Sequence, residues 1–409
     1  MRWIDHWVGL PLCFLFGLLV RTWRQLRPHA ARSVSGRRPI AVFKFFGLGS
    51  IVEATPLLRA IRARYPGARL VFVTFESNAG LLRRLNLCTD VRLIRTDAPL
   101  HFVTDVLRQV AWLIRQRTEA VIDLEFFSKF STLLSFLSAA PIRVAFHLND
   151  FWRYSLVTHP VYFNYYRHIT EVYEQVGRQL DIPIEDSRVS TIAVDECTVR
   201  TVAQGLQRRG WSAGQRLLGI NINAGDLALE RRWPRANFEM LIRALLARHA
   251  DIFIVLTGSP ADREYVGALL ERLPPAAGAR VISCAGTWTL DEFIAALSLF
   301  DGFITNDSGP MHLAAAQGVP LVSLWGPARP EFYAPRVVNH RVLYERYPCS
   351  PCVNMFTTFA GMWCHHEGWC MQAITPEAVL EAAKEMLAAA DVRPPRHTRG
   401  AGVPSAVGV

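Results

Sequence analysis

The stretch that decides the fold is TNDSGPMHLAAAQGVP, residues 305–320. The short apolar run at 300–305 predicts a buried strand, and the alanine-rich run at 311–317 predicts a helix. Asp307 and Ser308 are residue types that favour the turn or cap just before a helix. The stretch therefore predicts a strand–loop–helix unit, the repeating element of an open α/β sheet.

The loop of this unit carries the polar groups of a candidate binding site. Asp307, Ser308, Gly309 and His312 would gather at the helix N-terminus, on the carboxyl side of the strand. Exposed N–H groups and partial positive charge let such a terminus hold phosphate, and this edge of the sheet is where ligands bind. The alternative is that Asp307 and Ser308 only cap the helix while His312 packs. The convergence of four such positions favours a ligand site.

The motif DSG-x-x-H followed by AAA-x-G-V-P resembles glycosyltransferase family 9, the ADP-heptose:lipopolysaccharide heptosyltransferases. The resemblance covers about residues 39–388. It implies an α/β fold of GT-B architecture, in which two Rossmann-like doubly wound domains face a central cleft. It also implies that the N-terminal domain binds the acceptor and the C-terminal domain binds the nucleotide-sugar donor.

The composition points to an anionic partner. The chain has 409 residues, which suits two domains, and a net charge of +10 carried almost entirely by arginine. Guanidinium groups pair well with phosphate, so a membrane surface or a phosphorylated substrate is favoured. We expect no nucleic-acid partner, because no zinc-finger, basic-zipper or RNP pattern is present.

Residues 1–38 differ from the rest of the chain. Their apolar core at 7–20 is shorter than the span of about 20 residues that a bilayer needs. We predict a membrane-associating apolar or amphipathic helix at the cytoplasmic face of the bacterial inner membrane. A transmembrane helix and a helix packed on the protein's own core are the alternatives, and a signal peptide is disfavoured. An arginine-rich stretch suited to anionic headgroups follows: Arg21, Arg24, Arg27, Arg32, Arg37 and Arg38.

The first β–loop–α unit reads FGLGSIVEATP, with Gly47 and Gly49 suited to a tight turn near a ligand. In family 9 the same loop carries an aspartate regarded as the catalytic base, and this chain has Ser50 there. Glu53 and Glu125 are the candidate replacements. The alternative is that Glu53 is a solvated helix residue and Glu125 a loop charge.

The pattern predicts two domains, over 39–210 and 211–374, and the resemblance implies that the first binds the acceptor and the second the nucleotide-sugar donor. A C-terminal helix at 375–390 and a disordered tail at 391–409 complete the prediction. Residues 140–185 mix aromatic and basic side chains that could line an acceptor groove or simply pack, so we assign them no role.

The second domain repeats strands and helices joined by loops of small residues. Asn223 opens the loop NAGDLALERRWP, in which Arg231 and Arg232 precede Trp233. The resemblance implies that this R-W-P element contacts the donor diphosphate, and two guanidiniums suit that charge. Gly258, after another predicted strand, completes the predicted donor site.

Four cysteines near the C-terminus have the spacing C-x2-C-x11-C-x5-C: Cys349, Cys352, Cys364 and Cys370. A structural zinc site, packed thiols and one disulfide are the possible interpretations. We assign no metal ligands and expect no cofactor besides the nucleotide-sugar substrate.

The resemblance predicts an inverting, metal-independent glycosyltransferase. It would move a sugar, a heptose from ADP-heptose, onto a lipopolysaccharide-core or related cell-envelope glycolipid. One alternative is a glycosyltransferase with a different nucleotide-sugar donor for surface polysaccharide. The other is a catalytically inactive glycan-binding protein at the membrane surface.

Overall fold

The computed structural model describes residues 5–26, 33–126, 128–147, 153, 155–225, 228–353, 364 and 366–391. The chain divides into two compact units, Met1–Ser190 and Thr191–Val409. The predicted tail at 391–409 lies outside the described residues apart from its first residue. Each unit is described by itself.

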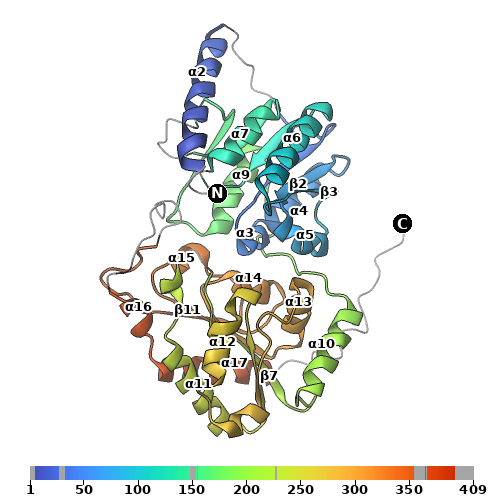
Figure 1. The fold of residues 1–409 in the computed structure, drawn as a ribbon. Coiled ribbons are helices and arrows are strands. Elements are labelled where there is room, and N and C mark those ends of the chain that lie inside the picture. Colours follow the sequence, from blue (N-terminus) through green and yellow to red (C-terminus); the bar gives the residue numbers. More distant parts are fainter. Residues whose placement is uncertain are drawn as a thin grey trace. The chain divides into compact units, whose positions relative to one another are not determined.

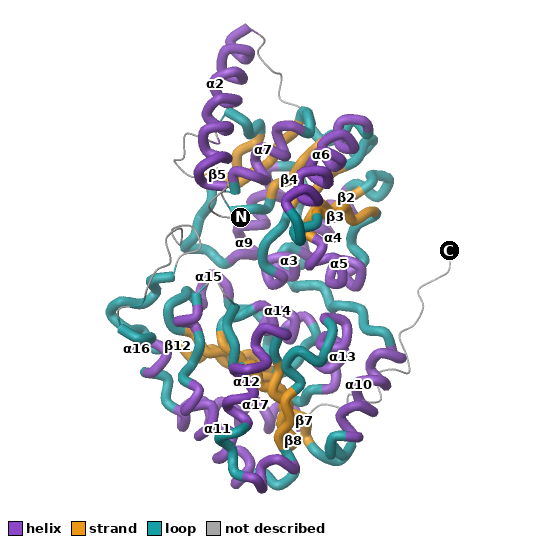
Figure 2. The backbone as a smooth tube through the Cα atoms, viewed as in Figure 1, coloured by secondary structure: helices purple, strands orange, loops and turns teal. Residues whose placement is uncertain are grey.

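Unit 1 is built on a six-stranded parallel sheet in the order β3-β2-β1-β4-β5-β6 (Figures 1 and 2). The central strands are almost wholly buried, as expected for a parallel sheet covered on both faces. The strands are β1 (Ile40–Phe43), β2 (Leu70–Phe75), β3 (Asp90–Ile94), β4 (Ala120–Asp123), β5 (Ile142–His147) and β6 (His159–Tyr162).

Helices cover both faces of this sheet. Side chains of α6 and α7 join Phe43, Val73 and Val121 of the sheet in one core cluster, whereas α9 packs against α4. The helices are η1 (Asp5–Gly9), α2 (Leu10–Leu26), α3 (Leu48–Glu53), α4 (Thr55–Arg64), η2 (Glu76–Asn78), α5 (Ala79–Leu85), α6 (Pro99–Arg115), α7 (Lys129–Leu137) and α9 (Ile169–Gln179).

Unit 2 repeats the plan with a second six-stranded parallel sheet, in the order β12-β11-β10-β7-β8-β9. Its strands are β7 (Arg216–Asn221), β8 (Ile252–Thr257), β9 (Val281–Ser283), β10 (Gly302–Asn306), β11 (Leu321–Trp325) and β12 (His340–Tyr344). Its larger core cluster joins the sheet to α11, α12 and α17.

The helices of unit 2 begin with α10, which lies before the predicted domain boundary at 210 but belongs to this unit. They are α10 (Glu196–Arg208), η3 (Leu229–Arg231), α11 (Arg235–Arg248), η4 (Pro260–Asp262), α12 (Arg263–Leu270), η5 (Pro275–Ala279), α13 (Leu290–Leu299), α14 (Gly309–Ala316), α15 (Pro330–Tyr333), α16 (Trp369–Gln372) and α17 (Pro376–Asp391).

Among the described residues, no helix combines the length and the apolar character needed to cross a membrane. The N-terminal helix α2 packs against α7 through a small cluster that includes Cys13 and Leu156. The helix therefore packs on the protein's own core. Whether it also touches a membrane stays a prediction.

A buried ion pair braces the centre of unit 1. The Arg153 guanidinium donates to Asp123 Oδ2 at 2.5 Å, and Ser131 Oγ donates to the same oxygen at 2.8 Å. Both charged side chains are almost completely buried. Burial raises the pKa of Asp123, and this effect outweighs the lowering by Arg153. The pair ties the end of β4 to the segment before β6.

We predict that Asp123→Asn destabilises unit 1 strongly, because the substitution leaves the Arg153 guanidinium buried without a counter-charge. The expected loss is about 3–5 kcal/mol in the free energy of unfolding. Chemical denaturation followed by circular dichroism measures it. The matched control is Asp97→Asn at an exposed carboxylate, which should leave the denaturation midpoint unchanged. Equal midpoints for both variants would show that the buried pair is not a brace.

Candidate functional site

The sheet of unit 2 has a topological switch point between β7 and β10. From β7 the chain proceeds outward through β8 and β9, then returns to the other side of β7 to build β10, β11 and β12. At such a point neighbouring loops diverge, and α/β proteins bind ligands in the crevice that results. The residues predicted for the donor site follow these two strands: Asn223 after β7, and Asp307 and Ser308 after β10.

Buried amides hold the two strand ends together. Asn306 Nδ2 donates to the carbonyls of Ile222 and Asn223 at 3.0 and 3.2 Å. Its Oδ1 accepts from Trp233 N at 3.0 Å. Asn221 Nδ2 donates to Ser308 Oγ at 3.1 Å. Ser308 therefore faces inward and fixes the loop, and it makes no side-chain cap bond to α14.

Arg231 and Asp307 form the polar centre of the junction. Arg231 Nη1 donates to the Asp307 carbonyl at 3.0 Å and lies 3.3 Å from its Oδ2. Arg231 also donates to the carbonyls of Ala228 and Gly225 at 3.3 and 3.2 Å. Both side chains are more than four-fifths buried. The structure thus brings a predicted phosphate-binding arginine to the N-terminus of α14.

Arg232 points to a different neighbour. Its guanidinium lies 4.3 Å from the ring centroid of Tyr265 and 3.5 Å from Asp262 Oδ1. Among the residues that the structure describes, its buried Nε has no hydrogen-bond partner, and the same is true of Asn223 Oδ1. Burying a polar atom without a hydrogen bond lowers the stability of the fold by about 1–3 kcal/mol. Such atoms near a candidate site therefore mark places where a ligand could form a hydrogen bond.

The remaining predicted residues have distinct places. Gly258 lies so close to Asn223 that a Cβ there would be 2.7 Å from the amide nitrogen, so this loop needs glycine. Gly309 begins α14. His312 is buried within α14 and meets the ring of Tyr333 edge-on, with the centroids 5.9 Å apart.

Unit 1 has its own switch point, between β1 and β4, and Glu125 lies there. Glu125 Oε1 accepts from Lys44 Nζ at 3.0 Å and from the backbone nitrogens of Phe45 and Phe46 at 2.5 and 2.9 Å. Both members of this ion pair are buried. Lys44 also lies 5.2 Å from the ring centroid of Phe126. Glu125 therefore holds the loop that leads into Gly47, so the alternative of a simple loop charge does not describe it.

The Gly47 loop caps α3. Gly47 has a φ of 83°, a conformation that disfavours other residues. Gly49, Ser50 and Glu53 are all buried within α3. The interpretation of Glu53 as a solvated helix residue is therefore wrong. The helix restarts near Pro56, since α3 ends at Glu53 and α4 begins at Thr55.

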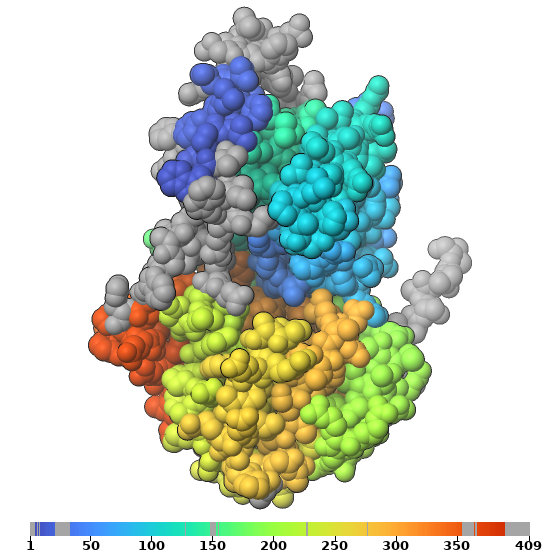
Figure 3. Space-filling view, viewed as in Figure 1, coloured from blue at the N-terminus to red at the C-terminus, as the bar shows by residue number. Residues whose placement is uncertain are grey.

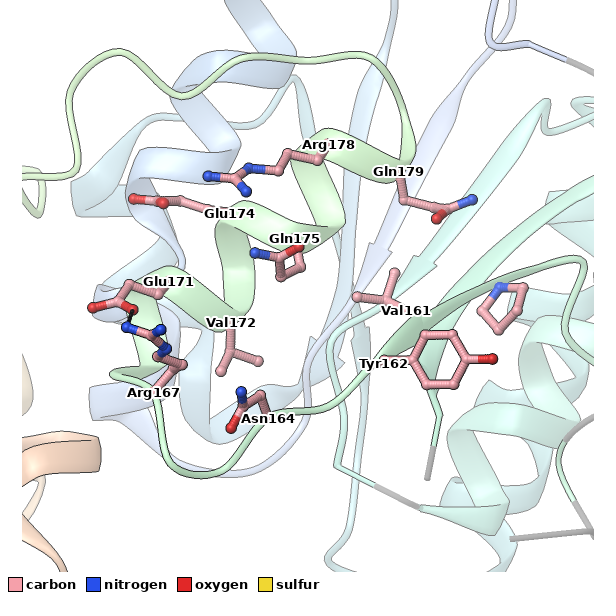
Figure 4. A pocket seen from close by; sticks show the side chains of 11 residues that line it. Val161, Tyr162, Asn164, Arg167, Glu171, Val172, Glu174, Gln175, Arg178 and Gln179 are labelled. Carbon is pink, nitrogen blue, oxygen red and sulfur yellow. Dashed lines mark ion pairs between the residues drawn. The ribbon is translucent and has the colours of Figure 1, made fainter. Parts of the chain in front are cut away.

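A groove of about 700 Å³ runs between β6 and α9 (Figure 4). Tyr162, Asn164, Gln175 and Arg178 are among the side chains that line it. On another side of the same helix, Tyr173 Oη donates to the Ser50 carbonyl at 3.4 Å. Helix α9 thus links the groove to the Gly47 loop. This groove falls in the aromatic and basic stretch to which the sequence assigned no role.

The C-terminal cysteines are free thiols, so the disulfide interpretation is not supported. Burial, with smaller contributions from the neighbouring thiols Cys352, Cys349 and Cys364, raises the pKa of Cys370 to about 11. In the part of the chain that the structure describes, no group of three or more His, Cys, Asp or Glu side chains is arranged to hold a metal ion.

Several functional neighbours escaped sequence reasoning. They have no catalytic signature of their own, and the signal that could have found three of them is their position at strand ends: Asn221, Thr257 and Asn306. These residues are Lys44, Arg153, Asn221, Thr257, Thr305 and Asn306.

Curated relatives share part of this chain. A lipooligosaccharide heptosyltransferase 2 of Campylobacter jejuni is 29% identical over 175 residues, 42% of this chain and 52% of that protein. The lipopolysaccharide heptosyltransferase 2 of Escherichia coli K12 is 34% identical over 113 residues, 28% of this chain and 32% of that protein. The chain therefore spans about half the length, or less, of these relatives.

Solved structures share the fold over most of the chain. The Escherichia coli ADP-heptose lipopolysaccharide heptosyltransferase II superposes with a TM-score of 0.69 at 22% identity, covering 87% of this chain and all of that one. A glycosyl transferase family 9 protein from Veillonella parvula gives a TM-score of 0.70 at 24% identity, covering 86% of this chain and 97% of that one. At this identity the likeness establishes the fold alone.

The family model establishes the family of this chain, which the partial alignments with these relatives do not. The model for glycosyltransferase family 9 (heptosyltransferase) matches residues 108–362, more than half of the chain, and includes the Arg231–Asp307 junction. With two parallel sheets of the same strand order and the predicted donor-site residues at the second switch point, this protein belongs to glycosyltransferase family 9.

Proposed function

We propose that this protein transfers a heptose from ADP-heptose, with inversion, to a lipopolysaccharide-core or related cell-envelope glycolipid. The observation that carries the proposal is the buried Arg231 at the N-terminus of α14. A guanidinium and a helix N-terminus together offer fixed positive charge to a diphosphate. Family membership supports the donor, because the relatives are heptosyltransferases.

The donor diphosphate would bind at the β7–β10 switch point in unit 2. As the sugar leaves, negative charge grows on the diphosphate, and preorganised donors stabilise that charge more than the ground state. Arg231 is held in place by backbone carbonyls, so it needs no rearrangement. The unbonded Nε of Arg232 and the amide of Asn223 supply further polar contacts for the nucleotide-sugar.

The acceptor would bind to unit 1, as the family resemblance implies. A base takes the proton of the acceptor hydroxyl while its oxygen attacks the anomeric carbon. Glu53 and Glu125 remain the proposed bases, since Ser50 alone cannot serve. The groove along α9, lined by Tyr162, amide side chains, two arginines and two glutamates, suits a polar oligosaccharide.

The proposal includes a site of action and a metal requirement. The acceptor is a membrane glycolipid, so the protein would work at the cytoplasmic face of the inner membrane, bound peripherally or monotopically. Arginine and a helix N-terminus would neutralise the diphosphate, so no divalent cation would be needed for this purpose. Transfer should therefore persist in EDTA. The stereochemical course would be read from the anomeric coupling of the product by NMR.

We predict that Arg231→Gln lowers kcat/KM for ADP-heptose about 100-fold, because it removes charge at the departing diphosphate and loosens the Asp307 loop. Arg232→Gln should cost about tenfold, the effect of one charge-assisted hydrogen bond. Initial rates with membrane-extracted acceptor and isothermal titration with ADP measure both effects. The matched control is Arg243→Gln on α11, a half-exposed arginine paired with Glu239.

The control should transfer sugar at the wild-type rate. Wild-type kinetics for Arg231→Gln would remove this residue from the donor site. Turnover with UDP-sugars and none with ADP-heptose would instead move the assignment to another nucleotide-sugar. Binding of ADP-heptose without any transfer would favour the inactive glycan-binding protein.

We predict different behaviour for the two buried carboxylates of unit 1. Glu125→Gln should lower both transfer and the free energy of unfolding, the latter by about 3 kcal/mol, because Lys44 loses its buried counter-charge. Glu53→Gln should lower kcat by about 100-fold or more if Glu53 is the base, while ADP affinity stays unchanged. The catalytic base is the residue whose substitution removes the titration of a basic group from the pH–rate profile of the enzyme. If neither variant changes kcat, the base lies elsewhere.

A further inference from the structure

The outer face of α2 is apolar along most of its length. Phe14, Leu15, Leu18 and Leu19 are each more than half exposed, and Leu12 is about one-third exposed. The opposite face, with Cys13 and Phe16, packs on the protein core. Between residues 6 and 20 the sequence has no Asp, Glu, Lys or Arg. A surface helix that is apolar on both faces needs a second apolar environment.

The helix is held in a fixed orientation. Asp5 accepts hydrogen bonds from Phe130 N at 2.7 Å and Lys129 N at 3.3 Å, in the first turn of α7. Further along, the rings of Phe16 and Phe136 lie 5.4 Å apart. Two points of attachment at opposite ends of α7 prevent α2 from turning its apolar face inward. In Figure 3 the helix lies at the surface of unit 1.

The direction of α2 follows from the same contacts. Helix α7 connects the carboxyl end of β4 to the amino end of β5, so it runs back across the sheet. Because Asp5 of η1 meets the start of α7, and Phe16 of α2, which follows η1 directly, meets the end of α7, α2 and α7 run in the same direction. The C-terminal half of α2 therefore lies near the amino ends of the strands.

A basic pocket lies at that same edge of the sheet. Its volume is about 330 Å³, and it is lined by Ser33, Ser35, Arg37, Arg38 and Ile142 around the starts of β1 and β5. Both arginines are exposed, and neither guanidinium has a hydrogen-bond or ion-pair partner among the described residues. One carboxylate, Glu119, also lines the pocket, and it already accepts hydrogen bonds from the backbone nitrogens of Ser35 and Gly36.

The chain itself joins the apolar face to this pocket. Only residues 27–32 separate the last described residue of α2 from Ser33, and seven peptide steps span at most about 25 Å. The sequence from 21 to 32 adds four arginines, whose side chains lie outside the described part. An apolar helix face followed within a short reach by concentrated positive charge matches an anionic lipid surface.

We infer that α2 docks unit 1 on an anionic phospholipid bilayer, with Phe14, Leu15, Leu18 and Leu19 in the acyl boundary and Arg37 and Arg38 on lipid phosphates. The inference extends the proposed function, in which the acceptor is a membrane glycolipid. Only the biological purpose of docking rests on that proposed function. Because α2 also caps the helix that follows the Glu125 loop, docking would hold this loop at the membrane surface.

The test is sedimentation of the purified full-length chain with vesicles of phosphatidylglycerol and phosphatidylcholine, or of phosphatidylcholine alone. Wild-type protein should bind the anionic vesicles and lose binding as salt rises. Phe14→Glu with Leu15→Glu should weaken binding about tenfold or more. The matched control, Met240→Glu with Val338→Glu, changes two exposed apolar side chains of unit 2 and should bind normally.

A second pair of variants tests the phosphate contacts without touching the helix. Arg37→Gln with Arg38→Gln should weaken binding to anionic vesicles and leave residual binding to phosphatidylcholine unchanged. Arg115→Gln with Arg208→Gln, at exposed arginines elsewhere, removes the same charge and should have little effect. Circular dichroism melting checks that each variant folds.

Three results would overturn the inference: no vesicle binding by the wild type, unaltered binding by Phe14→Glu with Leu15→Glu, or equal losses in each variant and its control. A dimer that dissociates when the α2 face is changed, with no vesicle binding, would assign the face to a second copy. Lipid binding is measured without sugar transfer, so this inference and the proposed function can fail independently.

Discussion

The contact between Arg231 and Asp307 is the constraint on which the candidate site of unit 2 depends. It joins two loops that are far apart in the sequence and that leave the sheet on either side of its switch point. Most of the Arg231 donors are used on backbone carbonyls, which fixes the guanidinium before any ligand arrives. The positive charge is then preorganised, and preorganised charge is the main means by which a protein stabilises a leaving diphosphate.

The same device appears in unit 1 with the charges exchanged. There a buried carboxylate, Glu125, is held by Lys44 and two backbone nitrogens at the β1–β4 switch point. A buried pair of this kind contributes little net stability but makes the loss of either partner costly. It therefore favours one loop conformation over others. In both units the sheet order creates a switch point, and a charged side chain held by backbone groups fixes the loop beside it.

Much of the fold could be predicted from the sequence, because its buried strands are continuous apolar runs separated by helix caps. The strand predicted at 300–305 and the helices predicted at 311–317 and 375–390 correspond to β10, α14 and α17. Edge strands are harder to predict, because β6 and β12 are partly exposed and contain polar residues, so they lack the apolar run that identifies a central strand. Periodicity carries little information at the edges of a sheet.

The site was predictable in its residue types but not in its contacts. Arg231 and Asp307 are visible in the sequence, yet their pairing depends on which strands are neighbours. Ser308 looked like a ligand contact or a cap, and the neighbouring Asn221 makes it an internal tie. Lys44 gave no signal at all, because a lysine at a strand end is ordinarily solvated, and only the fold shows the buried carboxylate it meets.

The two adjacent arginines of the R-W-P element look equivalent in the sequence, but they have different contacts in the structure. Trp233 is fully buried, and its indole donates to the Ile374 carbonyl at 2.9 Å, which anchors the element between the sheet and the last helix. With that anchor fixed, neighbouring side chains must diverge. Arg231 points to the N-terminus of α14, where its hydrogen bonds hold the Asp307 loop. Arg232 turns to Tyr265 and keeps an unbonded Nε. The first arginine thus builds the site, and the second retains the capacity to bond what enters it.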